Sequence, residues 1–149
     1  MELDFGGFGK EYAADRAADV LRQHGVQHGY VNLADRPRQP LLREGNDKLF
    51  GGSGQDRVFG GEGVCSLFGG EGNDSINGGE NNDTIFGDNG NDDVYASGGM
   101  DVIFGGNNDD ELAGSDGSDM LYGGSNDDTL WGGSEDDTAF GDAGNDIIN

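Results

Sequence analysis

Residues 51–59 read Gly51-Gly52-Ser53-Gly54-Gln55-Asp56-Arg57-Val58-Phe59, and this order of residue types returns every nine residues. From Leu42 to Asn149 the chain divides into twelve such units without insertion or deletion, because 12 × 9 = 108 residues. The shared pattern is Gly-Gly-x-Gly-x-Asp-x-U-x, in which U is an aliphatic residue. A repeat this short and regular predicts a solenoid, in which each coil contacts only its neighbours.

The sixth position of the unit is aspartate in eleven of the twelve units, and Cys65 is the exception. A solvated acidic face would mix glutamate with aspartate and would not hold a fixed register. A short carboxylate at one place in a tight turn is instead typical of a site for a hard, oxygen-seeking cation. We therefore predict that calcium is bound by Asp47, Asp56, Asp74, Asp83, Asp92, Asp101, Asp110, Asp119, Asp128, Asp137 and Asp146.

Glycine fills the first position in ten units, with Leu42 and Ala96 as exceptions, and the fourth position in eight. Glycine permits the positive φ angles that curl a chain around an ion and expose its carbonyl groups. Asparagine, the commonest non-glycine residue to tolerate that region, replaces it at Asn81, Asn108 and Asn126. Glu135 is the one replacement that does not obviously fit this geometry.

The eighth position is apolar in every unit, and the ninth is aromatic in nine units. Because side chains alternate between the two faces of a strand, the eighth residue lies opposite the seventh and the ninth. We expect the eighth residues to form the core and the aromatic residues to stack in an outer ladder. A carbohydrate-binding aromatic platform is an alternative function for the ladder. The aromatic residues are Phe50, Phe59, Phe68, Phe86, Tyr95, Phe104, Tyr122, Trp131 and Phe140.

A six-residue turn followed by a three-residue strand, repeated, winds into a flat coil with two units per turn. The twelve units therefore predict an all-β fold, a parallel β-roll (β-solenoid) of six coils. Its two short parallel sheets would enclose the eighth-position side chains. We expect this roll to occupy residues 42–149, after a short α/β fragment over residues 1–36 and a linker over residues 37–41.

The charge of the chain is concentrated in the repeats. Residues 1–41 carry five basic and six acidic residues, and residues 42–149 carry three basic and twenty-four acidic residues, a net of −21. Stacked coils align the aspartates in rows, and so few apolar residues cannot offset that repulsion as well as the ordering entropy. We therefore expect the repeats to be disordered without calcium and folded with several calcium ions bound.

Composition also excludes several classes of function. A net charge of −22 repels nucleic acid and anionic membranes and attracts cations. No stretch approaches the roughly 18 apolar residues that a transmembrane span needs. The one cysteine excludes an internal disulfide framework, so any cross-linking must come from metal.

Residues 42–149 resemble the hemolysin-type (RTX) repeats of bacterial toxins, proteases, lipases and adhesins. This resemblance implies calcium ions between successive turns, held by the sixth-position aspartates and by main-chain carbonyls of the glycine turns. It also implies an extracellular protein exported by a type I system. No N-terminal signal peptide, C-terminal export signal or end cap is visible, so we expect a truncated chain or a gene remnant. Cys65 departs from the pattern and should weaken any site that it lines.

The N-terminal region predicts a helix over residues 10–24 and a strand over residues 30–33. It resembles a piece of the FAD:protein FMN transferases (the ApbE family). The resemblance rests on Leu3-Asp4-Phe5-Gly6-Gly7-Phe8-Gly9-Lys10-Glu11-Tyr12-Ala13-Ala14-Asp15-Arg16 and on Gly29-Tyr30-Val31-Asn32-Leu33. It implies that Asp4 and Lys10 contact FAD and that the Gly7 carbonyl meets Mg²⁺. Glu11 stands where that family usually has glycine, and the later metal-binding aspartate and threonine have no counterpart.

Three functions follow from these patterns. The first is a calcium-folded structural or binding module of a secreted protein, with calcium ions as its partners. The second is an enzyme, a flavin transferase whose fragment is inactive alone. The third is a calcium-dependent adhesin with a surface or carbohydrate ligand. His24 and His28 have the spacing of a zinc-protease helix, but Gly25 would break that helix, and we interpret them as surface residues.

Overall fold

The computed structural model describes residues 30–32 and 46–149, and every regular element within them is a β-strand. No helix of the length and apolarity that a membrane span requires occurs among these residues. The predicted helix over residues 10–24, the residues Asp4, Gly7 and Lys10, and both proposed domain boundaries lie outside this part of the chain. The strand predicted over residues 30–33 is present as β1, Tyr30–Asn32.

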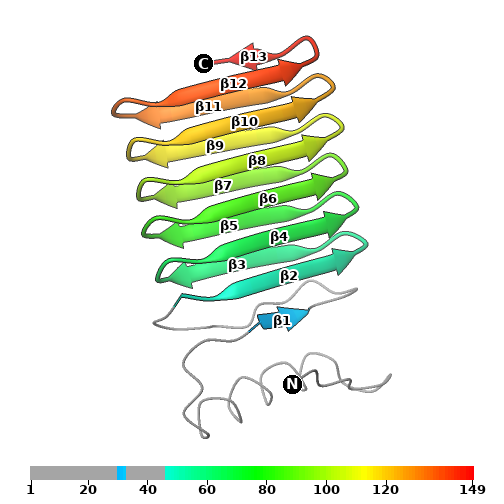
Figure 1. Cartoon of the computed structure of the whole chain (residues 1–149), viewed down its shortest axis with the longest axis vertical. Helices are drawn as coiled ribbons and strands as arrows, with labels where there is room; N and C mark the ends of the chain where they lie inside the picture. Colours follow the sequence, from blue (N-terminus) through cyan, green and yellow to red (C-terminus); the bar gives the residue numbers. More distant parts are fainter. Residues whose placement is uncertain (1–29, 33–45) are drawn as a thin grey trace, which may run out of the picture.

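The strands form two parallel sheets that lie face to face (Figure 1). One sheet has the order β1-β2-β4-β6-β8-β10-β12 and the other the order β13-β11-β9-β7-β5-β3. After β1 the strands are β2 Lys48–Ser53, β3 Arg57–Glu62, β4 Ser66–Glu71, β5 Ser75–Glu80, β6 Thr84–Asn89, β7 Asp93–Gly98, β8 Val102–Asn107, β9 Glu111–Asp116, β10 Met120–Ser125, β11 Thr129–Ser134, β12 Thr138–Ala143 and β13 Ile147–Ile148.

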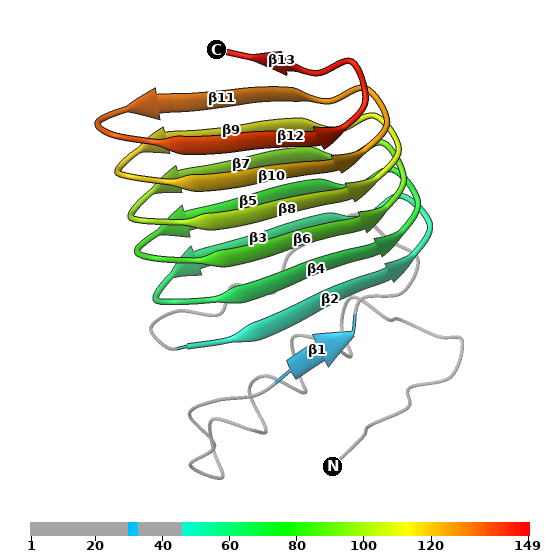
Figure 2. The same cartoon turned by 45° about the horizontal axis from the view of Figure 1, so that its top comes forward.

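Each strand pairs with the strand two places along the chain, so the structural period is eighteen residues. Leu67 of β4, for example, is aligned with Leu49 of β2 and with Ile85 of β6. Two units therefore make one coil, and about six coils are stacked along the axis of the molecule, as Figure 2 shows from a second direction. The predicted parallel β-roll is confirmed.

The prediction of three-residue strands was wrong, because the strands from β2 to β12 have six residues and the turns between them have three. Each strand runs from the seventh position of one unit to the third position of the next. The glycine pair therefore belongs to the strand rather than to the turn, and the coils approach each other closely at most of these glycines. A Cβ atom on Gly51 would lie 2.6 Å from the carbonyl oxygen of Gly69 in the next coil.

The core is a column of eighth-position side chains between the two sheets, as predicted, except that Ile148 in the last coil is 53% exposed and lies outside it. These residues are at most 1% exposed from Leu49 to Leu130, and Ala139 is partly buried against them. Cys65 and Ala96 are buried in the same cluster. Two aliphatic side chains per coil, one from each sheet, are a small core for a domain of this size, so burial alone contributes little stability per coil.

β1 lies outside the repeats, yet it continues the seven-stranded sheet beyond β2. Tyr30, Val31 and Asn32 are aligned with Lys48, Leu49 and Phe50, again an offset of eighteen residues. The first coil is thus covered by a strand in the place of a preceding repeat. The sequence offered no recognisable cap, because three residues in a strand carry no repeat pattern.

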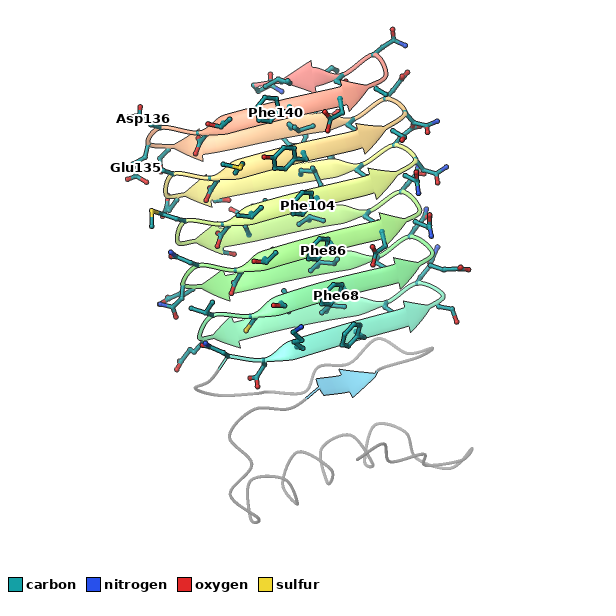
Figure 3. All side chains as sticks on the ribbon, in the orientation of Figure 1. Phe68, Phe86, Phe104, Glu135, Asp136 and Phe140 are labelled. Atoms are coloured by element: carbon teal, nitrogen blue, oxygen red, sulfur yellow. The ribbon has the colours of Figure 1, made fainter. Side chains whose placement is uncertain are left out.

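The aromatic ladder is confirmed on one sheet only. Successive rings of Phe50, Phe68, Phe86, Phe104, Tyr122 and Phe140 are stacked, with centroids 4.6–5.3 Å apart and planes within 14° of parallel (Figure 3). On the other sheet Phe59, Tyr95 and Trp131 alternate with Asn77 and Ala113 in the aligned positions. The prediction of one ladder of nine rings was wrong, because alternate units belong to different sheets.

Candidate metal centre

The sixth-position residues lie in two rows, one along each edge of the roll. The Asp92 row follows the strands of the seven-stranded sheet and contains Asp56, Asp74, Asp92, Asp110, Asp128 and Asp146. The Asp101 row follows the strands of the other sheet and contains Asp47, Cys65, Asp83, Asp101, Asp119 and Asp137. Figure 3 marks the edge of the Asp101 row by the labelled Glu135 and Asp136.

Within each row the aspartates are linked by hydrogen bonds from coil to coil. The main-chain N–H of Asp92 donates to Oδ1 of Asp110 at 2.9 Å, and the N–H of Asp74 donates to Oδ1 of Asp92 at 2.8 Å. In the other row the N–H of Asp83 donates to Oδ1 of Asp101 at 2.7 Å. One oxygen of each of these carboxylates is therefore held in place by the preceding coil.

The second oxygen of these carboxylates is buried and has no hydrogen-bond partner within the described part of the chain. This holds for Oδ2 of Asp74, Asp83, Asp92, Asp101, Asp110, Asp119 and Asp128, and each of these residues is at most 3% exposed. A buried carboxylate oxygen that neither water nor protein satisfies is strongly unfavourable. A bound cation would satisfy each such oxygen.

The unpartnered oxygens lie against the first-position glycines, beside a carbonyl group of the next coil. A Cβ atom on Gly69 would meet Oδ2 of Asp74 at 2.5 Å and the carbonyl oxygen of Gly87 at 2.7 Å. The same arrangement recurs at Gly105, with Asp110 and Gly123. The absence of a side chain at the first position thus allows one carboxylate oxygen and one main-chain oxygen of the next coil to lie close to the glycine Cα.

This geometry corrects the interpretation of the glycines. The first-position glycines do not take positive φ; the second and fourth positions do, as at Gly70 and Gly72, with φ of 112° and 118°. The three asparagines at the fourth position have φ of 81–84°, as predicted. Glu135 shares the conformation at 77°, so its side chain does not prevent the left-handed turn.

The electrostatics of the rows also favour cation binding. Burial raises the pKa of the Asp83 and Asp110 carboxyls to about 7 and that of Asp92 and Asp101 to about 6. The N–H donated to each carboxylate lowers the pKa, and neighbouring carboxylates such as Asp101 beside Asp83 raise it again. Desolvation therefore dominates. A divalent cation would reverse this balance by stabilising the charged form.

The residues present fit calcium, provided that main-chain oxygens complete the shell. Among residues 30–32 and 46–149, no three acidic, histidine or cysteine side chains gather around one point. Calcium takes about six to eight oxygen ligands and accepts carbonyl groups among them. The predicted aspartates could therefore each supply one carboxylate oxygen between two coils, and the turns could supply the carbonyls.

Cys65 occupies an aspartate position with a different donor. Its main-chain N–H donates to Oδ1 of Asp83 at 2.7 Å, as an aspartate would, so the ladder continues through the backbone. Burial raises the pKa of its thiol, and the Asp83 and Asp47 carboxylates raise it further. The side chain therefore carries a neutral thiol at neutral pH, and this soft group is a poor ligand for calcium.

Sequence reasoning missed the side chains of the fifth position. In the Asp92 row the N–H of Asn91 donates to Oδ1 of Asn73, and the N–H of Asn145 donates to Oδ1 of Asp127, at 3.1 and 2.8 Å. These bonds run in the opposite direction to those of the aspartate ladder. The available signal was that the fifth residue is Asn, Asp or Gln in every second unit, from Gln55 onward.

Two protein-family models match the chain, one in the repeats and one in the N-terminal region. The family model for the RTX calcium-binding nonapeptide repeat matches residues 43–64, 66–94, 86–121, 95–130 and 122–149. The model for the ApbE family matches residues 1–36. No curated protein and no solved structure matched the chain. The repeat matches cover well over half of the chain and coincide with the roll, and the chain therefore belongs to the family of RTX calcium-binding nonapeptide repeat proteins.

Proposed function

We propose that this chain is a calcium-folded module of a secreted protein, in which calcium ions bound between successive coils hold the β-roll together. One observation carries the proposal: seven buried carboxylate oxygens without partners recur at the same place in successive turns. Calcium would stabilise each of them and offset the repulsion along the row. The same ions would then be both the ligand and the condition for folding.

The proposed location follows from affinity and from the family. RTX repeats are typical of secreted proteins, and extracellular calcium modules typically have Kd values of about 10⁻⁴–10⁻³ M. Sites of that strength are empty in the cytosol and filled outside the cell. The module would therefore remain unfolded during synthesis and fold after export.

Calorimetric titration of the chain with calcium chloride, with magnesium chloride as control, tests the proposal. We expect several calcium ions per chain, bound with a large favourable enthalpy that reflects coupled folding. Magnesium should give little heat, because it dehydrates reluctantly and demands a tighter octahedral shell. Equal heats for the two metals would contradict a specific calcium site.

The match of residues 1–36 to the ApbE family favours a second candidate, a flavin-binding fragment. Asp4 and Lys10 would contact FAD, and Gly7 would meet Mg²⁺. Quenching of FAD fluorescence by the wild-type chain, and its loss in Lys10→Ala, would support this function. Unchanged FAD fluorescence would contradict this second function.

The stacked ladder gives no support to a carbohydrate platform. Sugars bind to the faces of aromatic rings, whereas the inner rings from Phe68 to Tyr122 cover the faces of one another. Only the edges of these rings point away from the sheet. The stacked ladder therefore lends no support to the adhesin function.

A further inference from the structure

The two rows of turns differ in how well they keep the repeat pattern. In the six units of the Asp92 row the first position is always glycine and the sixth is always aspartate. The departures at these positions, Leu42, Cys65 and Ala96, all belong to units of the Asp101 row. Units that share an edge are eighteen residues apart, so the turns of one row contact each other from coil to coil. The three departures therefore all affect the same edge of the roll.

Cys65 breaks the row of carboxylates within the Asp101 row. The Asp92 row contains five successive steps in which one aspartate N–H donates to Oδ1 of the next aspartate. The described bonds of the Asp101 row contain three such steps, between Asp83 and Asp137. Beside Gly60, in the unit of Cys65, a Cβ atom would meet the Gly78 carbonyl and Leu67 but no carboxylate.

Ala96 places a methyl group at a position where the other described units have glycine. It is the first-position residue of the unit that contains Asp101, and it is fully buried. In the matching unit of the other row, a Cβ on Gly87 would lie 2.5 Å from both Oδ2 of Asp92 and the carbonyl oxygen of Gly105. A methyl group at the Asp92-row position would therefore displace the carboxylate oxygen, so the Asp101 unit must hold its carboxylate differently beside Ala96.

The fifth-position side chains also differ between the two rows, and those of the Asp92 row are the more polar. The fifth position of the Asp92 row is polar throughout and links coils through Asn73, Asp109 and Asp127. In the Asp101 row one described link of this kind remains, from the Met100 N–H to Oδ1 of Asn82 at 3.0 Å, and Val64 and Met100 at this position are 45% and 59% exposed. These side chains supply no oxygen and no charge to attract a cation.

We propose that the two edges of the roll bind calcium unequally: the Asp92 row fills first and drives folding, and the Asp101 row fills at higher calcium. This inference rests on the calcium-binding function proposed above and concerns its order. Five intact steps along one edge can bind ions in neighbouring sites, each of which orders the next coil. The interrupted edge then closes on a roll that is already formed.

The matched variants Asp92→Asn and Asp101→Asn test this order. Both aspartates lie near the middle of the roll, are at most 2% exposed, and take part in the aspartate ladder on both sides. Calcium-dependent far-ultraviolet circular dichroism gives the folding midpoint, and calcium analysis after equilibrium dialysis gives the number of bound ions. Both readouts use the full chain.

We expect Asp92→Asn to raise the folding midpoint at least about fivefold and Asp101→Asn to raise it less than about twofold, since ligand charge sets calcium affinity. Asp101→Asn should instead lower the number of calcium ions bound at the highest calcium concentrations, where the Asp101 row fills. The gain-of-function variant Cys65→Asp should increase the number of bound ions, and Cys65→Ser, which adds no charge, should not.

Equal midpoint shifts in Asp92→Asn and Asp101→Asn would overturn the difference between the rows and leave the calcium function intact. An unchanged number of ions in Cys65→Asp would also overturn it, because the thiol would then not be the reason for the weaker row. A wild-type chain that neither folds nor binds ions when calcium is added would overturn the proposed function itself, and this inference with it.

Discussion

Two kinds of column run through the interior of the roll, and they have opposite effects on its stability. The eighth-position column is aliphatic, and its side chains are fully covered by one another from Leu49 to Leu130. The aspartate rows are almost as deeply buried, but each described carboxylate from Asp74 to Asp128 has an oxygen without a partner. Burial of the first column stabilises the fold in any solution, whereas burial of the second is unfavourable without cations.

The contrast shows how a chain can make its fold conditional. The aliphatic column sets the register of the coils but has two side chains per coil, one from each sheet, so it cannot hold about six coils together alone. The aspartate rows occupy equivalent places in every coil, and a cation there converts a repulsive column into a cross-linked one. Substitutions in the aliphatic column should therefore lower the stability of the roll both with and without calcium. Substitutions in the aspartate rows should lower its stability with calcium and raise it without calcium.

The largest effect of a single substitution should come from the aliphatic column. Ile85→Ala removes a fully buried side chain from the middle of the roll and should lower the free energy of unfolding in saturating calcium by about 2–5 kcal/mol. Urea unfolding followed by circular dichroism measures the change. Thr84→Ala, on the outer face of the same strand, is the control and should cost far less. A loss below about 1 kcal/mol in Ile85→Ala would contradict a single aliphatic core.

A substitution in the aspartate rows should change sign with calcium. Asp110→Asn removes one buried carboxylate and should raise the calcium midpoint about tenfold, equivalent to about 1.4 kcal/mol. Without calcium the same variant should fold at a lower concentration of trimethylamine N-oxide, because a desolvated charge is gone. Asp109→Asn, the exposed neighbour, makes the same charge change and should alter both values much less. Destabilisation in both conditions would show that the carboxylate is satisfied without metal.

The pH should move the calcium-free and calcium-bound forms in opposite directions. Burial raises the pKa of Asp83 and Asp110 to about 7, whereas an unfolded carboxyl titrates near pH 4. The calcium-free roll therefore binds more protons than the unfolded chain, and its stability decreases as pH rises from about 4 to about 7.

Calcium requires the deprotonated carboxylates. When calcium is added to the roll that trimethylamine N-oxide folds without calcium, it should release protons between about pH 5.5 and about pH 7.5, whereas calcium added to the unfolded chain, whose carboxyls titrate near pH 4, should release few. Titrations in buffers of different ionisation enthalpy measure the released protons. No proton release from the calcium-free roll would mean that the buried carboxyls are not the ligands.

The smallest expected effect is the difference in stability lost when an aromatic residue is replaced on the outer face of one sheet or of the other. Phe86→Leu removes a ring stacked on both sides, at 4.9 and 5.0 Å, and should cost about 0.5–1.5 kcal/mol beyond its change in buried area. Tyr95→Leu removes a half-exposed ring that is aligned with Asn77 and Ala113, and it should cost less. Urea unfolding in calcium compares the two variants, and equal losses would mean that stacking adds nothing.

Much of the architecture could be predicted because the repeat is regular. The aspartates, the aliphatic eighth position and the pairing of units into coils follow from residue types at fixed spacing. The length of the strands could not be predicted, because the glycine pair suggested a turn, whereas close approach of the coils extends the ladder through Gly51 and its equivalents.

Features that depend on the eighteen-residue period were also harder to predict. Alignment of successive units compares residues on opposite edges and opposite sheets, so it merged the stacked ladder with Phe59, Tyr95 and Trp131. It likewise concealed that Cys65 and Ala96 share an edge. β1 could be predicted as a strand, but its pairing with β2 depends on contacts outside any repeat.

Far-ultraviolet circular dichroism during a calcium titration, from a chelated solution to about 10 mM, tests the central claim most directly, since that range exceeds the usual Kd of extracellular calcium modules. The same titration with magnesium is the control. We expect a cooperative transition from coil to β-structure that calcium produces, magnesium does not, and chelation reverses. A β-sheet spectrum already present in the chelated solution, or no change at any calcium concentration, would contradict a roll that folds by binding calcium.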